Sequence, residues 1–259
     1  MALVEVVDRG AVRHLVLNRP EKRNALNGEL CAALGAELER AADDDGVRVV
    51  VVRGNGGVFS SGMDVGELRE LSRAPERLRA FRRRLIAWWN LLEEMPKATV
   101  AQIEGVCLGG AFELALACDL RVMAREATAG IVETRVGLIP DVGGSSRLPA
   151  VVGLGNAKEL IMTGKLIDGA EAHRIGFANR VAPAAEIDAT TAQLCDELLA
   201  CAPLAVGRAK RVLDQVAKPA LAASLELEVA LQERLAASAD FGEATNAFFE
   251  RRAPQFRGR

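Results

Sequence analysis

The feature that most limits what this chain can fold into is the segment VRVVVVRG, residues 47–54. It is an almost continuous run of β-branched residues, and such a run predicts a strand that is covered on both faces. Strands covered in this way belong to sheets that carry helices on their surfaces. The segment therefore predicts an α/β fold with a buried sheet.

Strand and helix patterns alternate along the first two thirds of the chain. Residues 2–7 and 11–20 are rich in β-branched residues and are separated by the turn residues Asp8, Arg9 and Gly10, which predicts a hairpin. The alternation predicts stacked βαβ units with right-handed crossovers. Four later segments continue it, namely helical patterns over 27–42 and 75–94 and strands over 98–105 and 119–124.

From Pro203 to about Arg252 the chain shows helical patterns only. This change predicts two parts, a core over residues 1–202 and a C-terminal helical region over residues 203–259. The helical region would either fold over the core or make contacts between subunits, and the pattern leaves both possibilities open.

The composition, 259 residues of which 50% are hydrophobic, is that of a soluble globular protein. A formal charge of −2 gives no reason to expect nucleic acid or an anionic membrane as a partner. No apolar run approaches the roughly 18 residues of a membrane span, and the first residues show no signal-peptide pattern. The five cysteines form no CxxC pair, which favours the cytoplasm, and His14 and His173 have no neighbours at metal-ligand spacing.

The segment CLGGAFELALACD, residues 107–119, is the first candidate for chemistry. Gly109 and Gly110 predict a tight turn that opens a helix, with Glu113 in its first turn. A helix N-terminus presents unpaired backbone N–H groups and a partial positive charge, which suit a developing anion. An acid beside such a group of donors suits enolate or oxyanion chemistry, and an ordinary helix cap is the other interpretation.

Two further segments could contribute to the same site. In SSGMD, residues 60–64, Gly62 permits a turn that would point the Met63 N–H into a cleft, unless the loop is a plain strand-to-helix connection. The segment 129–149 contains Glu133, Asp141 and a Gly-Gly pair before a predicted helix. A predicted strand separates Glu113 from Glu133, so both carboxylates could point into one cleft and divide acid and base roles.

The chain resembles the crotonase (enoyl-CoA hydratase/isomerase) superfamily in motifs that occur in the family's order over nearly its whole length. These motifs are LNRPEKRNALN, FSSGMD, EGVCLGGAFELALACD, VGLIPDVGGSSRLP, AKELIMTGKLIDGAEAHRIGFANRV, APLAVGRAKRVL and FFERRAPQF. The resemblance implies a crotonase-like spiral of stacked ββα turns with a C-terminal helical region that builds homotrimers, often paired into hexamers.

The resemblance also implies roles for individual residues. The N–H groups of Met63 and Gly110 would form an oxyanion hole for the thioester oxygen of an acyl-CoA substrate. Glu113 would activate water for attack at the β-carbon, and Glu133 would exchange a proton at the α-carbon. CoA would be part of the substrate, and neither a metal nor a redox cofactor is implied. Further substrate contacts would come from Arg23, Ala25, Ser61, Gly62, Asp64, Val65, Gly109 and Phe256.

Asp141 leaves the reaction open. Many hydratases of this family have IPGAGG where this chain has IPDVGG, and an aspartate there is similar to dienoyl-CoA isomerases, in which it shuttles a proton with the residue at the Glu133 position. A helix N-cap before Val142 is the other interpretation of Asp141. A hydrolase of 3-hydroxyisobutyryl-CoA also combines acids at these two positions but lacks the acid at Glu113.

The resemblance therefore predicts an enoyl-CoA hydratase of the fatty-acid β-oxidation type. The alternatives are a dienoyl-CoA or Δ3,Δ2-enoyl-CoA isomerase, the hydrolase, and a non-catalytic protein that binds acyl-CoA or RNA. One branch of the family binds RNA through a basic helix. Here the cluster of arginines lacks interleaved exposed aromatics and is interpreted as a solvated helix face, formed by Arg77, Arg79, Arg82, Arg83 and Arg84. Trp88 and Trp89 are expected to pack or to line the acyl pocket.

Overall fold

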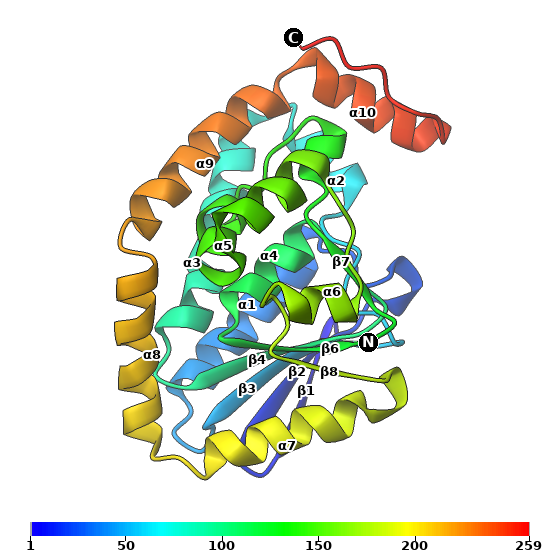
Figure 1. Ribbon diagram of the computed structural model, residues 1–259. Helices are drawn as coiled ribbons and strands as arrows, with labels where there is room; N and C mark the ends of the chain where they lie inside the picture. The colour runs from blue at the N-terminus through cyan, green and yellow to red at the C-terminus, as the bar shows by residue number, and fades with distance from the viewer. Residues whose placement is uncertain (1, 259) are drawn as a thin grey trace.

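A computed structural model describes residues 2–258, and its main sheet has six strands (Figure 1). In spatial order these are β1 (Val4–Arg9), β2 (Val12–Leu17), β3 (Val49–Gly54), β4 (Ala98–Ile103), β6 (Leu120–Ala124) and β8 (Arg180–Ala182). β1 and β2 pair antiparallel as the predicted hairpin, and the other neighbours pair in parallel. The predicted α/β architecture with parallel strands is confirmed.

The sheet is buried because its central strands are apolar on both faces. Val49, Val50, Val51 and Val52 of β3 are each at most 1% exposed, as the run of β-branched residues predicts. Burying each such side chain stabilises the fold by roughly 2 kcal/mol. Helix α7 (Ile187–Leu199) covers one side of the sheet, and α1 (Gly28–Asp43) lies on the other (Figure 1).

A second, small sheet determines where the next helix begins. Its two parallel strands are β5 (Val106–Leu108) and β7 (Thr128–Gly130). The helix α4 (Gly110–Ala117) follows β5 directly, and the N–H of Gly109 donates to the carbonyl of Gly130 at 2.8 Å. The small sheet therefore fixes the position of the Gly-Gly turn relative to the segment that leads to Glu133.

Two of the remaining helices, α3 (Pro75–Glu94) and α5 (Gly144–Thr163), lie where the sequence predicted helices. Three helices were not predicted, namely α2 (Val65–Leu71), α6 (Gly169–Arg174) and α7. Helix α2 begins where the Asp64 side chain accepts from the N–H groups of Gly66 and Glu67. Short 3₁₀ turns are η1 (Pro20–Lys22), η2 (Glu133–Val136) and η3 (Ala184–Glu186).

The chain after Pro203 is helical, as predicted. It forms α8 (Pro203–Ala217), α9 (Leu221–Ala236) and α10 (Ala239–Glu250). Figure 1 shows α8 and α9 along one flank of the molecule, and α9 packs against α3 and α5 of the same chain. This region therefore folds over its own core, and its use in subunit contacts, like the division at 202/203, stays a prediction. Within residues 2–258, no helix has the length and apolar character needed to cross a membrane.

Candidate active site

The Gly-Gly turn brings the start of α4 close to Glu133. Gly109 has φ +53°, a conformation that favours glycine, and a Cβ at this position would lie only 2.9 Å from the Glu133 Oε1 atom. Gly110 is the first residue of the helix, so its N–H has no partner within the helix. The glycines therefore allow a carboxyl group and a free helix end to meet, as the sequence suggested.

A cavity of about 250 Å³ lies at this helix end. Glu113, Glu133 and Asp141 all line it, which confirms that the carboxyl groups of separate segments share one cleft. Most of the remaining wall is apolar or backbone, and it is formed by Ser61, Gly62, Met63, Val65, Leu68, Arg82, Leu108, Gly109, Gly110, Val132, Val136, Leu138, Gln232 and Phe248.

Two backbone N–H groups adjoin each other in this wall. A Cβ added to Gly110 would lie 3.9 Å from the Met63 nitrogen, and one added to Gly62 would lie 3.7 Å from the Gly110 nitrogen. Leu26 bonds to both neighbours of Met63, accepting from the Asp64 N–H and donating to the Gly62 carbonyl. The Met63 N–H takes no part in that bridge, and the bridge fixes the loop that places the Met63 nitrogen near Gly110.

Glu113 is held by the backbone of a different segment. Its side chain is 1% exposed, and its Oε1 atom accepts from the N–H groups of Val142 at 3.0 Å and Gly144 at 2.8 Å. Burial raises the pKa of Glu113 well above its ordinary value, and the nearby Glu133 and Asp141 act in the same direction. The two N–H donors oppose this effect because they stabilise the charged form.

Glu133 lies at the start of η2 and faces the cavity. Burial raises its pKa to about 7, and the charge of Asp141 adds to the effect. Its Oε2 atom has no hydrogen-bond partner among residues 2–258. A carboxyl group with a pKa near neutrality and an open oxygen is suited to exchanging a proton with a bound molecule.

Asp141 forms a buried ion pair with Arg82 of α3. Arg82 Nε lies 2.7 Å from Asp141 Oδ2, and the side chains are 4% and 3% exposed. Burial raises the pKa of Asp141 to about 6, and the guanidinium opposes this rise. The N-cap interpretation of Asp141 is wrong, because α5 begins at Gly144 with Gly143 as its N-cap and no side chain bonds to it there.

The prediction that Arg82 lies on a solvated face of α3 is wrong. Arg77, Arg79, Arg83 and Arg84 are exposed as expected, whereas Arg82 is buried. The helical spacing of the sequence could have shown this burial. Leu78 lies four residues before Arg82, and Leu85 and Trp89 lie three and seven residues after it, so all of them share the buried face of the helix. An arginine at that spacing must find a partner inside the protein.

The other predicted contact residues divide into two groups. Ser61, Gly62, Val65 and Gly109 line the cavity. Those outside its wall are Arg23, Ala25, Asp64 and Phe256. Of these, Asp64 caps α2 and pairs with Arg19 at 3.0 Å, Arg23 accepts from the Ser61 N–H through its carbonyl, and Phe256 is 45% exposed in the C-terminal segment.

The two tryptophans serve packing. Trp89 is 2% exposed in the core, and the Trp88 indole donates to Glu39, so neither lines the cavity. Gln232 of α9 and Phe248 of α10 line it instead. Sequence reasoning missed both, because they lie about a hundred residues or more from the acids and no local pattern connects them.

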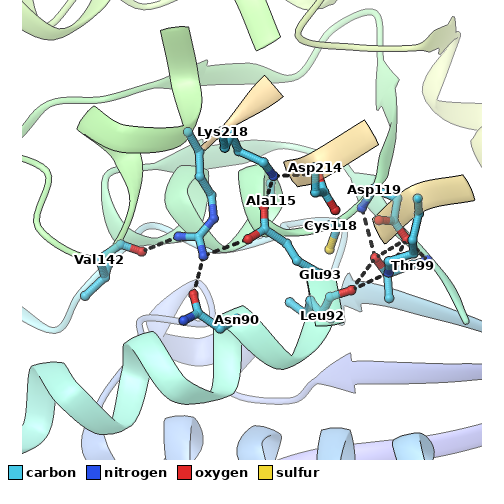
Figure 2. A network of polar contacts seen from close by, with 12 residues as sticks. Asn90, Leu92, Glu93, Thr99, Ala115, Cys118, Asp119, Val142, Asp214 and Lys218 are labelled. Atoms are coloured by element: carbon cyan, nitrogen blue, oxygen red, sulfur yellow. Dashed lines mark hydrogen bonds and ion pairs between the residues drawn. The ribbon is translucent and has the colours of Figure 1, made fainter. Parts of the chain in front are cut away.

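A buried polar network supports the segment that holds Glu113 (Figure 2). Arg147 donates to the Val142 carbonyl at 3.1 Å and pairs with Glu93 of α3 at 3.1 Å. Glu93 also pairs with Lys218, which follows α8. Burial would raise the pKa of Glu93, but Arg147 and Lys218 outweigh it and hold this pKa below its ordinary value. The network therefore links the site to the C-terminal helices through charged side chains that are buried or half-buried.

A family model matches nearly the whole chain, and known proteins are similar to it over most of their length. The model of the enoyl-CoA hydratase/isomerase family matches residues 8–259. The chain is 38% identical to an enoyl-CoA isomerase/hydratase of Mycosarcoma maydis, over 96% of this chain and 93% of that protein. It is 37% identical to the 2,3-dehydroadipyl-CoA hydratase of Escherichia coli K12, over 95% of this chain and 94% of that one.

The fold is similar to that of solved structures with related names. An enoyl-CoA hydratase from Mycobacterium avium subsp. paratuberculosis superposes with a TM-score of 0.89 at 28% identity, over 99% of each chain. This likeness confirms the predicted crotonase-like fold.

Proposed function

The chain belongs to the enoyl-CoA hydratase/isomerase family, and on that premise we propose that it is an enoyl-CoA hydratase. It would add water reversibly across the 2,3 double bond of a 2-enoyl-CoA. The observation that carries the proposal is that Glu113 and Glu133 line one cavity beside the N–H groups of Met63 and Gly110. In this proposal CoA is part of the substrate, and the chain needs neither a resident metal nor a redox cofactor.

The two N–H groups would bind the thioester oxygen. Attack on the conjugated alkene places negative charge on this oxygen, and both donors are held in place before the reaction begins. Each such donor stabilises the transition state by roughly 3 kcal/mol. The position of Gly110 at the first turn of α4 adds the favourable field of the helix N-terminus.

The two glutamates would divide the proton transfers. Glu113, as carboxylate, takes a proton from water while the oxygen bonds to the β-carbon, and Glu133, as carboxyl, gives its proton to the α-carbon. Burial raises the pKa of both carboxyls, and the backbone donors oppose this rise at Glu113, so we assign the charge to Glu113 and the proton to Glu133, whose Oε2 atom is open. One proton is gained and one is lost by the pair, so a transfer from Glu113 to Glu133 restores the starting state.

Asp141 supports a second candidate function, the isomerisation of a dienoyl-CoA. It lines the same cavity as Glu133 and would have to carry a proton in that reaction. The ion pair with Arg82 favours hydration over this alternative, because the guanidinium at 2.7 Å stabilises the charged form of Asp141 and opposes the rise that burial gives its pKa. We therefore assign Asp141 as a fixed anion of the site.

One assay separates these candidates. The protein is incubated with crotonyl-CoA, a 3-enoyl-CoA and a 3,5-dienoyl-CoA, and the enoyl absorbance is followed. Hydration of crotonyl-CoA is the expected result. Dienoyl isomerisation without hydration of crotonyl-CoA or longer 2-enoyl-CoAs would replace the hydratase with the isomerase, and tight acyl-CoA binding without turnover would favour a binding protein.

We also propose a homotrimer or a pair of trimers. Support comes from apolar side chains that α8 and α9 leave exposed, namely Leu204, Val212, Leu213, Val216, Leu227 and Leu231. Exposed apolar surface of this kind marks interaction sites. Light scattering on the purified protein tests the assembly. The cytoplasmic location and the part in β-oxidation stay predictions.

A further inference from the structure

Three consecutive backbone N–H groups beside the cavity are each bound by a carboxylate, and two different helices supply these carboxylates. The N–H groups of Val142 and Gly144 donate to Glu113 of α4. The N–H of Gly143, between them, donates to Glu228 Oε2 of α9 at 2.8 Å. The turn is therefore bound both by an acid of the site and by an acid to which the proposed reaction gives no role.

Glu228 is built into this position. It is 4% exposed, and its second oxygen accepts from the Ser146 hydroxyl. One helical turn further along α9, Gln232 Oε1 accepts from the Ile139 N–H at 3.1 Å. Helix α9 therefore holds the segment from Ile139 to Ser146 at several points with two buried side chains.

The turn has little freedom to move if this contact is lost. Gly143 has φ +114°, and a Cβ there would lie 1.6 Å from Arg147 Nη1, so Arg147 fills the space on that side. A Cβ on Gly144 would lie 2.5 Å from Pro140 Cβ and 2.8 Å from Glu113 Oε1. Without Glu228 the Gly143 N–H would be buried without an acceptor, and shifting the turn to relieve this would move both donors of Glu113.

We propose that Glu228 is a positioning residue for Glu113: by binding the Gly143 N–H it fixes the turn whose neighbouring N–H groups orient the Glu113 carboxylate. The inference rests on the hydratase function proposed above, in which Glu113 activates water. It makes α9 part of the catalytic apparatus, although Glu228 lies 115 residues from Glu113 and is absent from the cavity wall.

Two variants separate a hydrogen-bonding role from a proton-transfer role. Glu228→Ala removes the acceptor, and we expect kcat for crotonyl-CoA hydration to fall roughly 10- to 100-fold while KM changes by less than about threefold. Glu228→Gln keeps an oxygen for the Gly143 N–H, and we expect it to stay within about threefold of the wild-type kcat. Glu226→Ala, on the exposed face of the same helix, is the matched control and should be unchanged.

Hydrogen exchange gives a readout that does not depend on turnover. In Glu228→Ala the amides of residues 139–146 should exchange faster than in the wild type, whereas in Glu228→Gln and Glu226→Ala they should not. If the wild type hydrates no 2-enoyl-CoA, the proposed function fails and this exchange pattern still decides whether Glu228 holds the turn. Unchanged exchange in Glu228→Ala, an unchanged kcat per folded molecule, or a Glu228→Gln variant as slow as Glu228→Ala would overturn the positioning role.

Discussion

Arg82 Nε and Asp141 Oδ2 lie 2.7 Å apart in the wall of the cavity, with both side chains buried. The pair joins α3 to the segment that precedes α5. It places a positive charge in a site that otherwise contains three acids, and it distinguishes a fixed aspartate from one that is free to carry a proton. Its contribution can be measured.

Replacing Arg82 should strongly destabilise the protein. Arg82→Gln leaves Asp141 buried without its cation, and we expect the free energy of unfolding to fall by about 3–5 kcal/mol in urea titrations. Arg83→Gln, one residue along on the exposed face of α3, should change it by less than about 0.5 kcal/mol. Equal effects of the two variants would show that the ion pair has no special weight.

Removing either glutamate of the site should slow hydration. Glu113→Gln and Glu133→Gln each lose one proton transfer, and we expect kcat with crotonyl-CoA to fall by roughly 10²–10⁴-fold. Glu70→Gln, an exposed position on α2, is the control and should keep the wild-type rate. A loss in only one of the two site variants would contradict the division of roles between them.

The Gly109 position offers a test of geometry alone. Gly109→Ala introduces a Cβ 2.9 Å from Glu133 Oε1 and should displace that carboxyl, lowering kcat by roughly 100-fold. Gly10→Ala is matched to it, since Gly10 also has a positive φ, +62°, but no atom lies within 4 Å of the added Cβ. It should lose stability by about 1 kcal/mol and keep its activity. Steady-state kinetics on both variants measures this difference. An equal loss of activity in both would contradict a specific effect of the Gly109 Cβ on Glu133.

The stability contributed by Glu228 should depend on pH. Burial raises the pKa of this carboxyl to about 7 from an ordinary value of 4.5, so the folded chain binds its proton more tightly than the unfolded chain does. This contribution is fully present below pH 4.5 and is lost as the pH rises towards 7.

Urea unfolding at pH 5 and pH 7.5 measures this effect. Relative to the wild type, Glu228→Gln should therefore be less stable at the lower pH than at the higher one, because the amide does not titrate. Glu226→Gln, at an exposed position of the same helix, is the control variant and is measured at both pH values. A difference for Glu228→Gln that stays constant between the two pH values would contradict the raised pKa.

Much of the fold was predictable from local pattern. The β-branched run became β3, the leucines of residues 27–42 gave α1 its buried face, and the all-helical end became α8 to α10. The Gly-Gly turn with Glu113 in the first helical turn was equally legible. Each of these features depends on neighbours a few residues apart, which a sequence displays directly.

The partners of the site residues could not be predicted from local sequence pattern. Helical spacing could have shown that Arg82 is buried, but not that its partner is Asp141, fifty-nine residues away. Two further features depend on how α9 and α10 pack over the core. One is the hydrogen bond between Glu228 and the Gly143 N–H, and the other is the place of Gln232 and Phe248 in the cavity wall.

The sequence by itself therefore determined most of the elements, the family and the acids that line the cavity. Tertiary structure alone decided which of those acids is paired, which has an open oxygen and which is bound by backbone N–H groups. The physical reason is that the protonation and orientation of a buried carboxyl depend on the atoms within a few ångströms of it, and in this protein distant segments of the chain supply those atoms.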